Sequence, residues 1–431
     1  MKLWFAIVCS LFALCLVSAQ AGTLDRGESA PKGWRDHVFR ANFAFPSKAR
    51  LEVRPWDAIN FRSAPSDYLN AVLHYAMEGQ DLEHWNLRRN KIRRWVHVPW
   101  LGPGVNGREF IHGLTRGRDL KPRELGPKQL RCRQNWALAF YNDVGGSVLG
   151  KIWGRGQHQP ELSALPFPPG TVAVKLVFTQ ATVEDDLRLQ SAPEILANIH
   201  ADNTASATAC ANATLDDGVG APRAPQKLRL IQVDVAVREV RASYKTGWVF
   251  GSFRFDGRLP GKDPWSKLAP LGLMWGNDPL LGDAEVLRGD RPRQTIMASV
   301  GIEFGRGGRM NGVVDERQSA CSSCHMAAQW PSVAPMTAPA PWADGKCWYR
   351  NVDGRYPFGF PPGQRDGCGD PAALKELTPL DFSLQLAIAL RNWSLNATQH
   401  SPKIKTTLGR LNRLSSDELE VNGLHALALR R

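Results

Sequence analysis

The sequence of 431 residues lacks any internal repeat with a period of about 20 to 50 residues, which argues against a solenoid or a propeller. Beyond residue 17 it also has no apolar run of about 20 residues, the length that a membrane-spanning helix needs. Acidic residues are fewer than basic ones, 41 against 54, so the formal net charge is +13. Hydrophobic residues at 43% and charged residues at 22% exclude a chain that is disordered along its whole length.

The N-terminus has the features of a secretory signal. Lys2 supplies a positive charge, residues 3–17 are apolar, and residues 19–21 (Ala-Gln-Ala) offer a small-residue cleavage site. A membrane anchor is the alternative, although the apolar stretch is short for a span. We expect residues 1–21 to be removed and the rest to be a soluble protein of a bacterial periplasm, without stable membrane insertion. Export also makes nucleic acid an unexpected partner despite the basic charge.

Cysteines are few, and their arrangement indicates a prosthetic group. Cys9 and Cys15 lie in the signal, which leaves six of the eight. Cys321 and Cys324 are followed by His325 in the pattern C-x-x-C-H, the attachment motif of c-type haem. Each of the two thiols can form a thioether with a haem vinyl group, and the imidazole can then ligate the iron. The motif predicts one covalent haem c, with His325 as the metal ligand.

A C-x-x-C pair can also be a redox dithiol or half of a zinc site. No thioredoxin-like unit surrounds this pair, and Cys347 and Cys368 are too far apart in sequence to be a second close pair. In an oxidising compartment the remaining cysteines are expected to form two disulfides. The preferred pairing is Cys132–Cys210 with Cys347–Cys368, because each bridge then closes a loop within one region. Free buried thiols are the alternative.

Methionine, the usual distal ligand of electron-carrying cytochromes c, is nearly missing after the motif. Met326 is adjacent to His325 and cannot fold back, and Met336 follows it closely. We therefore expect an open distal site, which binds or transforms a small molecule. An upstream histidine as sixth ligand would instead make the protein an electron carrier. The upstream candidates are His97, His112, His158 and His200.

From about residue 130 the pattern is that of strands. Four apolar runs bounded by turn residues are expected to be strands: 136–141, 171–178, 231–237 and 248–255. Along 231–237 apolar and polar side chains alternate, with Asp234 on the polar face. This period of two predicts an antiparallel sheet. The expected class is α+β, with an antiparallel β-sheet haem domain at 130–335 between helical and loop-rich extensions.

Helices and loops are expected outside that domain. The extensions are an N-terminal mixed region at 22–129 and a C-terminal loop and helix region at 336–431. One helix is expected from residue 66 to residue 76, and a second from a cap at Thr378 to Leu390. A basic cluster is either a solvated helix face or a docking patch for an acidic redox partner. Its members are Arg88, Arg89, Lys91, Arg93 and Arg94.

The order of the segments over residues 130–335 resembles cytochrome P-460 and its relative cytochrome c-prime-beta. The matching segments are FPPGTVAVKLVF (167–178), VDVAVRE (233–239), TGWVFGSFRF (246–255) and the CSSCH motif. The resemblance implies a dimeric, periplasmic haem protein built on a sheet. Insertions at 201–224 and 260–300 depart from the short family pattern.

Two further site residues follow from this resemblance. Lys175 matches the lysine that bonds to the haem ring in cytochrome P-460. The alternative interpretation is a lysine on the solvent face of a half-buried strand. Asp234 matches an acidic residue over the distal face and is the candidate catalytic residue. Such a carboxylate can accept protons as an N–H or O–H substrate is oxidised. The distal arginine of some members has no clear match near Leu138.

Three functions remain open at this point. The first is an oxidoreductase that acts on a small nitrogen compound, hydroxylamine or nitric oxide, at an open iron. The second is a non-enzymatic gas-binding haem protein, and the third is an electron-transfer cytochrome with an upstream histidine ligand. The first and third also require a redox partner protein.

Overall fold

In this computed structural model the chain is described over nine segments. They are 30–50, 52–102, 108–154, 159–201, 223–243, 245–298, 305–331, 348–352 and 377–400.

The described residues form one large antiparallel sheet and a small two-stranded one. The nine strands of the large sheet follow the order β1-β3-β4-β6-β7-β8-β9, with β2 beside β3 and β5 beside β6. Its strands are β1 (Trp95–Val96), β2 (Thr115–Arg116), β3 (Asn135–Asn142), β4 (Val172–Thr179), β5 (Glu194–His200), β6 (Arg223–Arg238), β7 (Trp248–Phe255), β8 (Leu268–Met274) and β9 (Thr295–Met297). The small sheet pairs β10 (Gln329–Trp330) with β11 (Thr378–Pro379).

Among the described residues helices are few and the large sheet is antiparallel, which confirms the α+β class and the antiparallel sheet predicted from the sequence. They are α2 (Pro65–Met77), α3 (Asp143–Ile152), α5 (Asp283–Leu287), α6 (Cys321–His325) and α7 (Leu384–His400). Among the described residues, no helix is long and apolar enough to cross a membrane.

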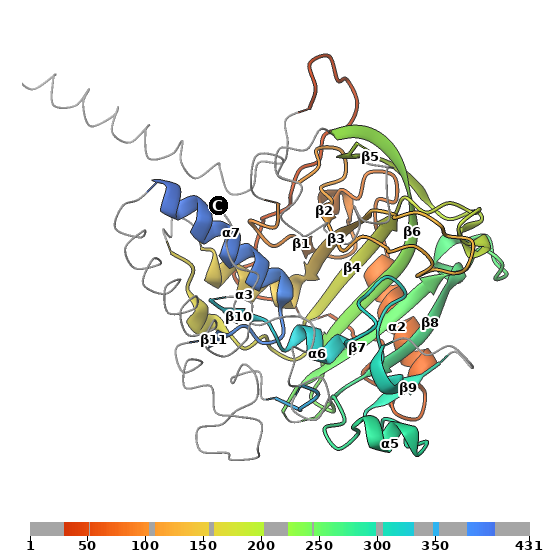
Figure 1. Ribbon diagram of the computed structural model, residues 1–431. Helices are drawn as coiled ribbons and strands as arrows, with labels where there is room; N and C mark the ends of the chain where they lie inside the picture. Colours follow the sequence, from red (N-terminus) through yellow and green to blue (C-terminus); the bar gives the residue numbers. More distant parts are fainter. Residues whose placement is uncertain are drawn as a thin grey trace, which may run out of the picture.

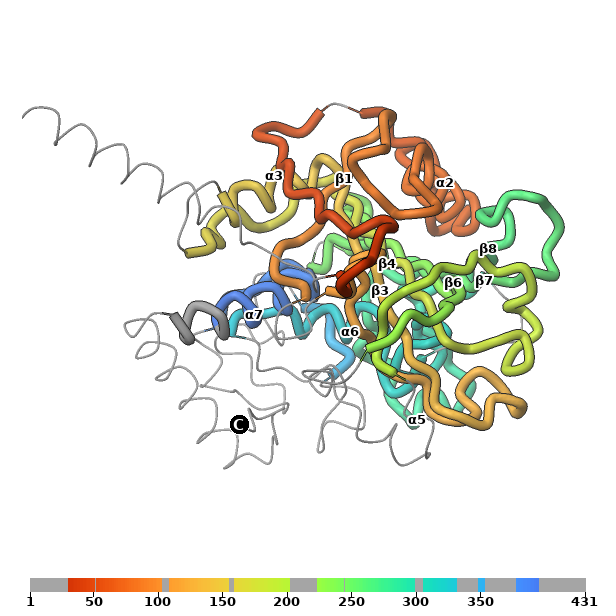
Figure 2. The backbone as a smooth tube through the Cα atoms, turned by 90° about the horizontal axis from the view of Figure 1, so that it is seen from above, coloured from red at the N-terminus to blue at the C-terminus, as the bar shows by residue number. Residues whose placement is uncertain are grey.

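Different helices cover the two faces of the large sheet. Seen from above, α2 lies on one side of the strands and α6 and α7 lie on the other (Figure 2). In β6 the apolar side chains Val233, Val235 and Val237 are buried on the α2 side. Asp234 and Ala236 point to the opposite face and keep accessible surface. The alternation along β6 therefore separates an apolar core from a face that is free to carry chemistry.

Helix α2 fits closely against the sheet because one strand position has no side chain. Leu69, Val72, Leu73 and Ala76 form its buried stripe, as the sequence predicts for a helix over 66–76. Gly251 of β7 faces this stripe, and a Cβ there would come within 2.2 Å of Leu69. The N-terminal region thus contributes β1, β2 and α2 to the same unit as the strands beyond residue 130 (Figure 1).

One local prediction is wrong. The second helix begins at Leu384, not at Thr378, because Thr378 and Pro379 pair with β10 and Asp381 has a positive φ of 47°. The region 260–300, which departs from the family pattern, contains β8 and β9, and these strands extend the sheet. The loop expected at 201–224 lies mostly outside the described residues.

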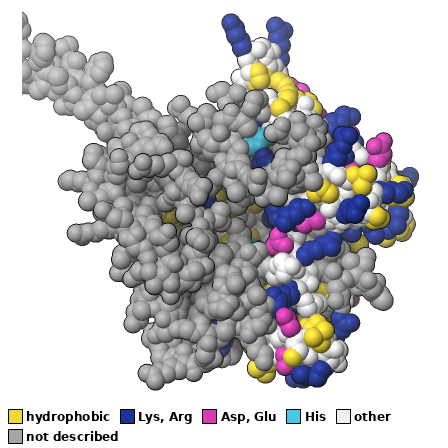
Figure 3. All heavy atoms as spheres, viewed as in Figure 1, with side chains coloured by type: hydrophobic (Ala, Val, Ile, Leu, Met, Phe, Trp, Pro, Cys, Tyr) yellow, Lys and Arg dark blue, Asp and Glu magenta, His cyan; other side chains and the backbone are white. Residues whose placement is uncertain are grey.

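The basic cluster does not form a regular helix face, and because Arg88, Arg89 and Lys91 are exposed, a docking patch stays a prediction. It holds one 3-10 turn, Leu87–Arg89. Arg93 pairs with Glu52 and Glu78, Arg94 with Asp143 and Arg89 with Asp81. Intramolecular pairs therefore use much of its charge. Other Lys and Arg side chains project along the margin near β6, β8 and α5, with acidic side chains between them (Figure 3).

Candidate functional site

The face of the sheet beneath α6 combines small side chains with a polar row. Across β3, β4, β6 and β7, the register aligns Ala139, Lys175, Asp234 and Ser252. The next row on this face consists of Tyr141, Ala173, Ala236 and Phe250. Alanines therefore form a low floor, bordered by two aromatic rings and by the polar residues.

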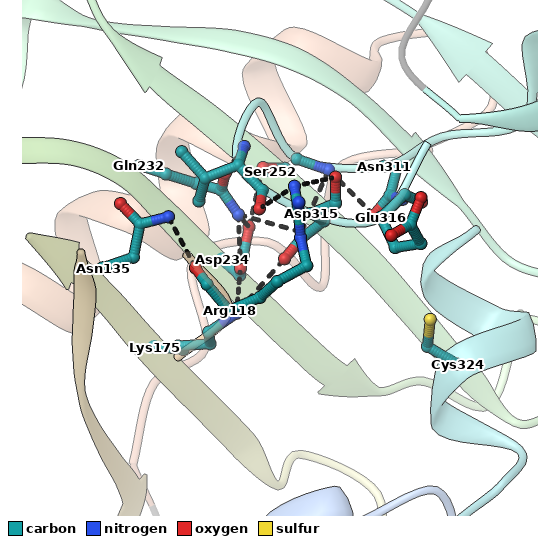
Figure 4. A network of polar contacts seen from close by, with 12 residues as sticks. Arg118, Asn135, Lys175, Gln232, Asp234, Ser252, Asn311, Asp315, Glu316 and Cys324 are labelled. Atoms are coloured by element: carbon teal, nitrogen blue, oxygen red, sulfur yellow. Dashed lines mark hydrogen bonds and ion pairs between the residues drawn. The ribbon is translucent and has the colours of Figure 1, made fainter. Parts of the chain in front are cut away.

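Lys175 and Asp234, both expected as site residues from the resemblance, are cross-strand partners on β4 and β6. The Lys175 ammonium Nζ lies 3.3 Å from Asp234 Oδ2 and 3.5 Å from Asp315 Oδ1. Gln232 spans the same two carboxylates, and its Nε2 donates at 2.8 Å to Asp234 and at 3.0 Å to Asp315. Ser252 Oγ donates to Asp234 at 2.7 Å. One ammonium is thus held between two carboxylates (Figure 4).

The charges in this cluster are coupled. Burial raises the pKa of Asp234, and the nearby Asp315 adds to the rise although Lys175 opposes it. Burial also opposes the charged form of Asp315, but Lys175 and Gln232 outweigh it and hold that pKa below its ordinary value. Burial disfavours the Lys175 ammonium, yet Asp315 and Asp234 together raise its pKa. Asp234 is consequently the carboxylate that takes up a proton more readily.

These groups keep accessible surface deep within the protein. The exposed fraction is 39% for the Lys175 side chain, 21% for Asp234 and 25% for Asp315. All three lie in or against the middle of the sheet, where a packed side chain would be covered. The surrounding chain therefore covers the cluster only in part.

Sequence reasoning missed Asp315, which comes from the loop before α6. Gly312 N and Gln232 Nε2 donate to its carboxylate, and Val314 N donates to Gln232 Oε1. Arg118 donates to the carbonyls of Val314 and Asp315. The loop is thus attached to the sheet just before the C-x-x-C-H motif begins. No spacing in the sequence relates this loop to β6.

Helix α6 carries the motif and lies next to the cluster, as Cys324 shows in Figure 4. Cys321 and Cys324 are partly accessible, and neither is in a disulfide. Burial raises the pKa of Cys324 to about 12, so its thiol is protonated at neutral pH. Burial and the charges of Asp234 and Asp315 likewise raise the pKa of Cys321. Both thiols therefore lie near the polar row of the sheet.

His325 is held in the form that a metal ligand needs. Its Nδ1 lies 2.7 Å from the Phe382 carbonyl oxygen, and its ring packs against Phe250 at 4.7 Å between centroids. Burial lowers the pKa of His325 to about 4, so the imidazole is neutral at pH 7. A neutral imidazole whose Nδ1–H faces a carbonyl has the lone pair on Nε2. Metal-ligating histidines characteristically donate their other N–H to such an acceptor.

These observations fit a c-type haem. Cys321 and Cys324 lie one helical turn apart, His325 has its Nε2 lone pair available, and the alanines place only small side chains on the sheet beneath α6. Lys175 and Asp234 would then border the ring. Haem attachment remains a proposal, developed below.

The upstream histidines, the alternative sixth ligands, each use one ring nitrogen in another contact or lie outside the described residues. His97 accepts from Asn42 N at 2.8 Å, and His112 Nε2 contacts the Glu83 carbonyl at 3.0 Å. His200 contacts Arg116. Met326 is buried, with its sulfur 3.9 Å from Asn277 Nδ2. His158 and Met336 belong to the part of the chain that is not described.

Cys132 is disulfide-bonded. Cys210, Cys347 and Cys368, with which the sequence could pair it, lie outside the described residues. The predicted connectivity therefore stays a prediction.

Comparisons with protein-family models, with curated proteins and with solved structures give no match to this chain.

Proposed function

We propose that the protein is a periplasmic c-type cytochrome with one covalent haem and an open distal site for a small nitrogen compound, hydroxylamine or nitric oxide. Cys321 and Cys324 would hold the haem through thioethers, and His325 would ligate its iron. The observation that carries the proposal is the contact of His325 Nδ1 with the Phe382 carbonyl at 2.7 Å. It supports a ligand role because it leaves Nε2 available, beside two thiols with the attachment spacing.

When bound, the haem supplies an iron that binds a small molecule and takes up electrons one at a time. Asp234 accepts the proton that an N–H or O–H substrate loses on oxidation. Lys175 and Ser252 stabilise the ionised form of this carboxylate, and Gln232 fixes its orientation. The electrons leave to a one-electron redox partner protein.

Lys175 enters this proposal as a charge partner. Its two carboxylate neighbours keep the amine protonated, and an ammonium has no lone pair with which to attack a haem carbon. The covalent bond that the resemblance implies would require that proton to leave first. An unusually red-shifted reduced Soret band, together with an added lysine-containing peptide on the haem, would establish the bond.

An electron-transfer cytochrome and a non-enzymatic gas-binding protein are the alternatives. An absorption spectrum of the purified protein, oxidised and reduced, with and without carbon monoxide, separates the electron carrier from our proposal, whereas turnover of hydroxylamine or nitric oxide separates the gas-binding protein. We expect a high-spin spectrum that shifts with the gas. Sharp low-spin bands that ignore the gas would mean a closed iron and an electron carrier.

The role of Asp234 is tested by Asp234→Ala with the haem content verified. We expect turnover of hydroxylamine to fall by about 10²- to 10⁴-fold, the usual contribution of a general base. Asp67→Ala is the control, since Asp67 is exposed on α2 across the sheet. Unchanged turnover would remove Asp234 from the mechanism.

Tight nitric oxide binding by the unsubstituted protein, without turnover of either compound, would favour the gas-binding alternative. The homodimer that the resemblance implies is a further prediction, for sedimentation analysis.

A further inference from the structure

A strained turn from the C-terminal region approaches the proximal side of the site. Asp381 and Phe382 are consecutive non-glycine residues with positive φ angles of 47° and 66°. L-residues with a side chain avoid this left-handed region, and two in succession persist only where the surroundings hold them. The turn directly precedes α7, and its Phe382 carbonyl contacts His325 of α6.

The carboxylate of Asp381 holds this turn against the sheet. It accepts from Phe167 N at 2.8 Å and from Trp248 Nε1 at 3.2 Å, and Arg238 Nε lies 3.8 Å away. The exposed fraction of Asp381 is 3%. Phe167 precedes β4, while Trp248 and Arg238 belong to β7 and β6. One buried carboxylate therefore joins the turn to three successive parts of the sheet.

Contacts on either side leave the turn little freedom. Ser383 Oγ lies 2.8 Å from the Tyr141 hydroxyl, and Leu380 N donates to the Ala328 carbonyl at 3.0 Å. Between these contacts, the Phe382 carbonyl points to His325 Nδ1. The direction of that carbonyl depends on the positive φ angles, and these depend on Asp381.

We propose that Asp381 is a positioning residue, which through the Phe382 carbonyl sets the orientation and the basicity of His325. The inference rests on the proposed function, because it concerns the histidine that would ligate the haem iron. A stronger Nδ1–H to carbonyl bond increases electron donation from the imidazole and stabilises the oxidised iron. Asp381 thereby lowers the reduction potential, although it lies outside the C-x-x-C-H motif and outside the region of family resemblance.

The test compares Asp381→Gly and Asp381→Asn in the full-length haem protein. Glycine tolerates positive φ but loses all side-chain anchors, whereas asparagine tolerates positive φ and keeps one acceptor oxygen. We expect the reduction equilibrium constant to rise about tenfold in the glycine variant, which is about 59 mV for one electron. The asparagine variant should fall between it and the unsubstituted protein. The iron–histidine stretching band of the reduced protein, seen by resonance Raman spectroscopy, should move to lower frequency in the same order.

Asp185→Asn is the matched control. Asp185 is also a buried aspartate that accepts a backbone N–H, but it lies beyond the opposite end of β4 from Phe167. Its loss should lower the melting temperature and leave the potential and the Raman band unchanged. If both Asp381 variants melt earlier but keep the original potential and band, Asp381 is a structural anchor only and the inference is overturned. If Asp381→Gly does not fold, Asp381→Asn decides alone.

The pyridine haemochrome spectrum of the unsubstituted protein distinguishes a failure of the proposed function from a failure of the inference about Asp381. Absence of covalent haem c would overturn the proposed function and the inference together. Its presence, with unchanged potentials in the variants, would overturn the inference alone.

Discussion

Removing the ammonium between Asp234 and Asp315 should destabilise the protein in a manner that depends on pH. In Lys175→Met the methionine side chain retains the aliphatic packing but provides no charge. The two carboxylates would then face each other with only Gln232 between them. The variant therefore isolates the electrostatic role of Lys175 without any assumption about haem.

The magnitude follows from the distances. At 3.3 and 3.5 Å, one ion pair amounts to about 5 kcal/mol at an effective dielectric constant near 20 and about 1 kcal/mol in water. Because 39% of the Lys175 side chain is exposed, solvent screening moves the value toward the lower limit. We expect the free energy of unfolding at pH 8 to fall by about 1–2 kcal/mol for the two pairs together.

The sign of the pH dependence follows from the pKa shifts. Without Lys175, burial and mutual repulsion raise the pKa of both carboxyl groups above that of the unfolded chain. A group whose pKa is raised on folding loses stability as the pH rises through that pKa. In the unsubstituted protein the pKa of Asp315 is lowered, so its contribution is present above the unfolded value and is lost only in acid. The loss caused by the substitution is thus larger at pH 8 than at pH 5.

Urea unfolding at both pH values, followed by circular dichroism, measures the effect. Lys151→Met, at an exposed position of α3, is the control and should stay within about 0.5 kcal/mol. The double variant Lys175→Met with Asp315→Asn should recover a large part of the loss, because a single carboxylate then remains. An equal loss at the two pH values, with no recovery in the double variant, would refute the reasoning.

Three further predictions concern other parts of the chain. Substituting both Cys321 and Cys324 by serine should make the haem extractable by acidified organic solvent, whereas either single variant should keep one thioether. Glu109→Gln should lower the free energy of unfolding by about 1–3 kcal/mol, because the buried carboxylate accepts from four backbone N–H groups and the amide has only one acceptor oxygen. Mass spectrometry of unreduced peptides should find Cys132 bonded to Cys210, and another partner would correct the pairing.

The sheet was predictable where side chains alternate without interruption. Along residues 231–237 of β6 the apolar side chains lie at every second position, so the two faces of this strand followed from a period of two. In β4 most side chains are apolar, and the opposition of Lys175 and Asp234 depends on the register of the two strands, which the period does not determine. Strand β8 was not predictable in this way. Its sequence contains Pro270 and Gly272, both rare within strands, and its register shifts opposite β7. In β8, pairing with the neighbouring strands outweighs the low strand propensity of the local sequence.

At the candidate site, too, the sequence predicts residues that are close in the chain but not residues that only the fold brings together. Cys321, Cys324 and His325 are recognisable because they are adjacent in sequence and their spacing has a chemical reason. Asp315 belongs to the same site but comes from an irregular loop, so only the fold brings it to Lys175. The start of α7 was predicted too early because Thr378 and Pro379 have the composition of a helix start but pair with β10 instead.

The site also explains why the motif region alone is an incomplete unit. His325 requires an acceptor for Nδ1, and that acceptor is a carbonyl more than fifty residues further along the chain. The carbonyl is held by a turn whose anchor, Asp381, contacts β6, which carries Asp234, β7, and Phe167, which precedes the β4 strand of Lys175. A displacement of the sheet would therefore reach the proximal histidine through Asp381 as well as the distal cluster. If haem is bound, the two sides of its iron are coupled through the same strands, and substitutions at Asp381 and Asp234 should have effects on the potential that are not additive.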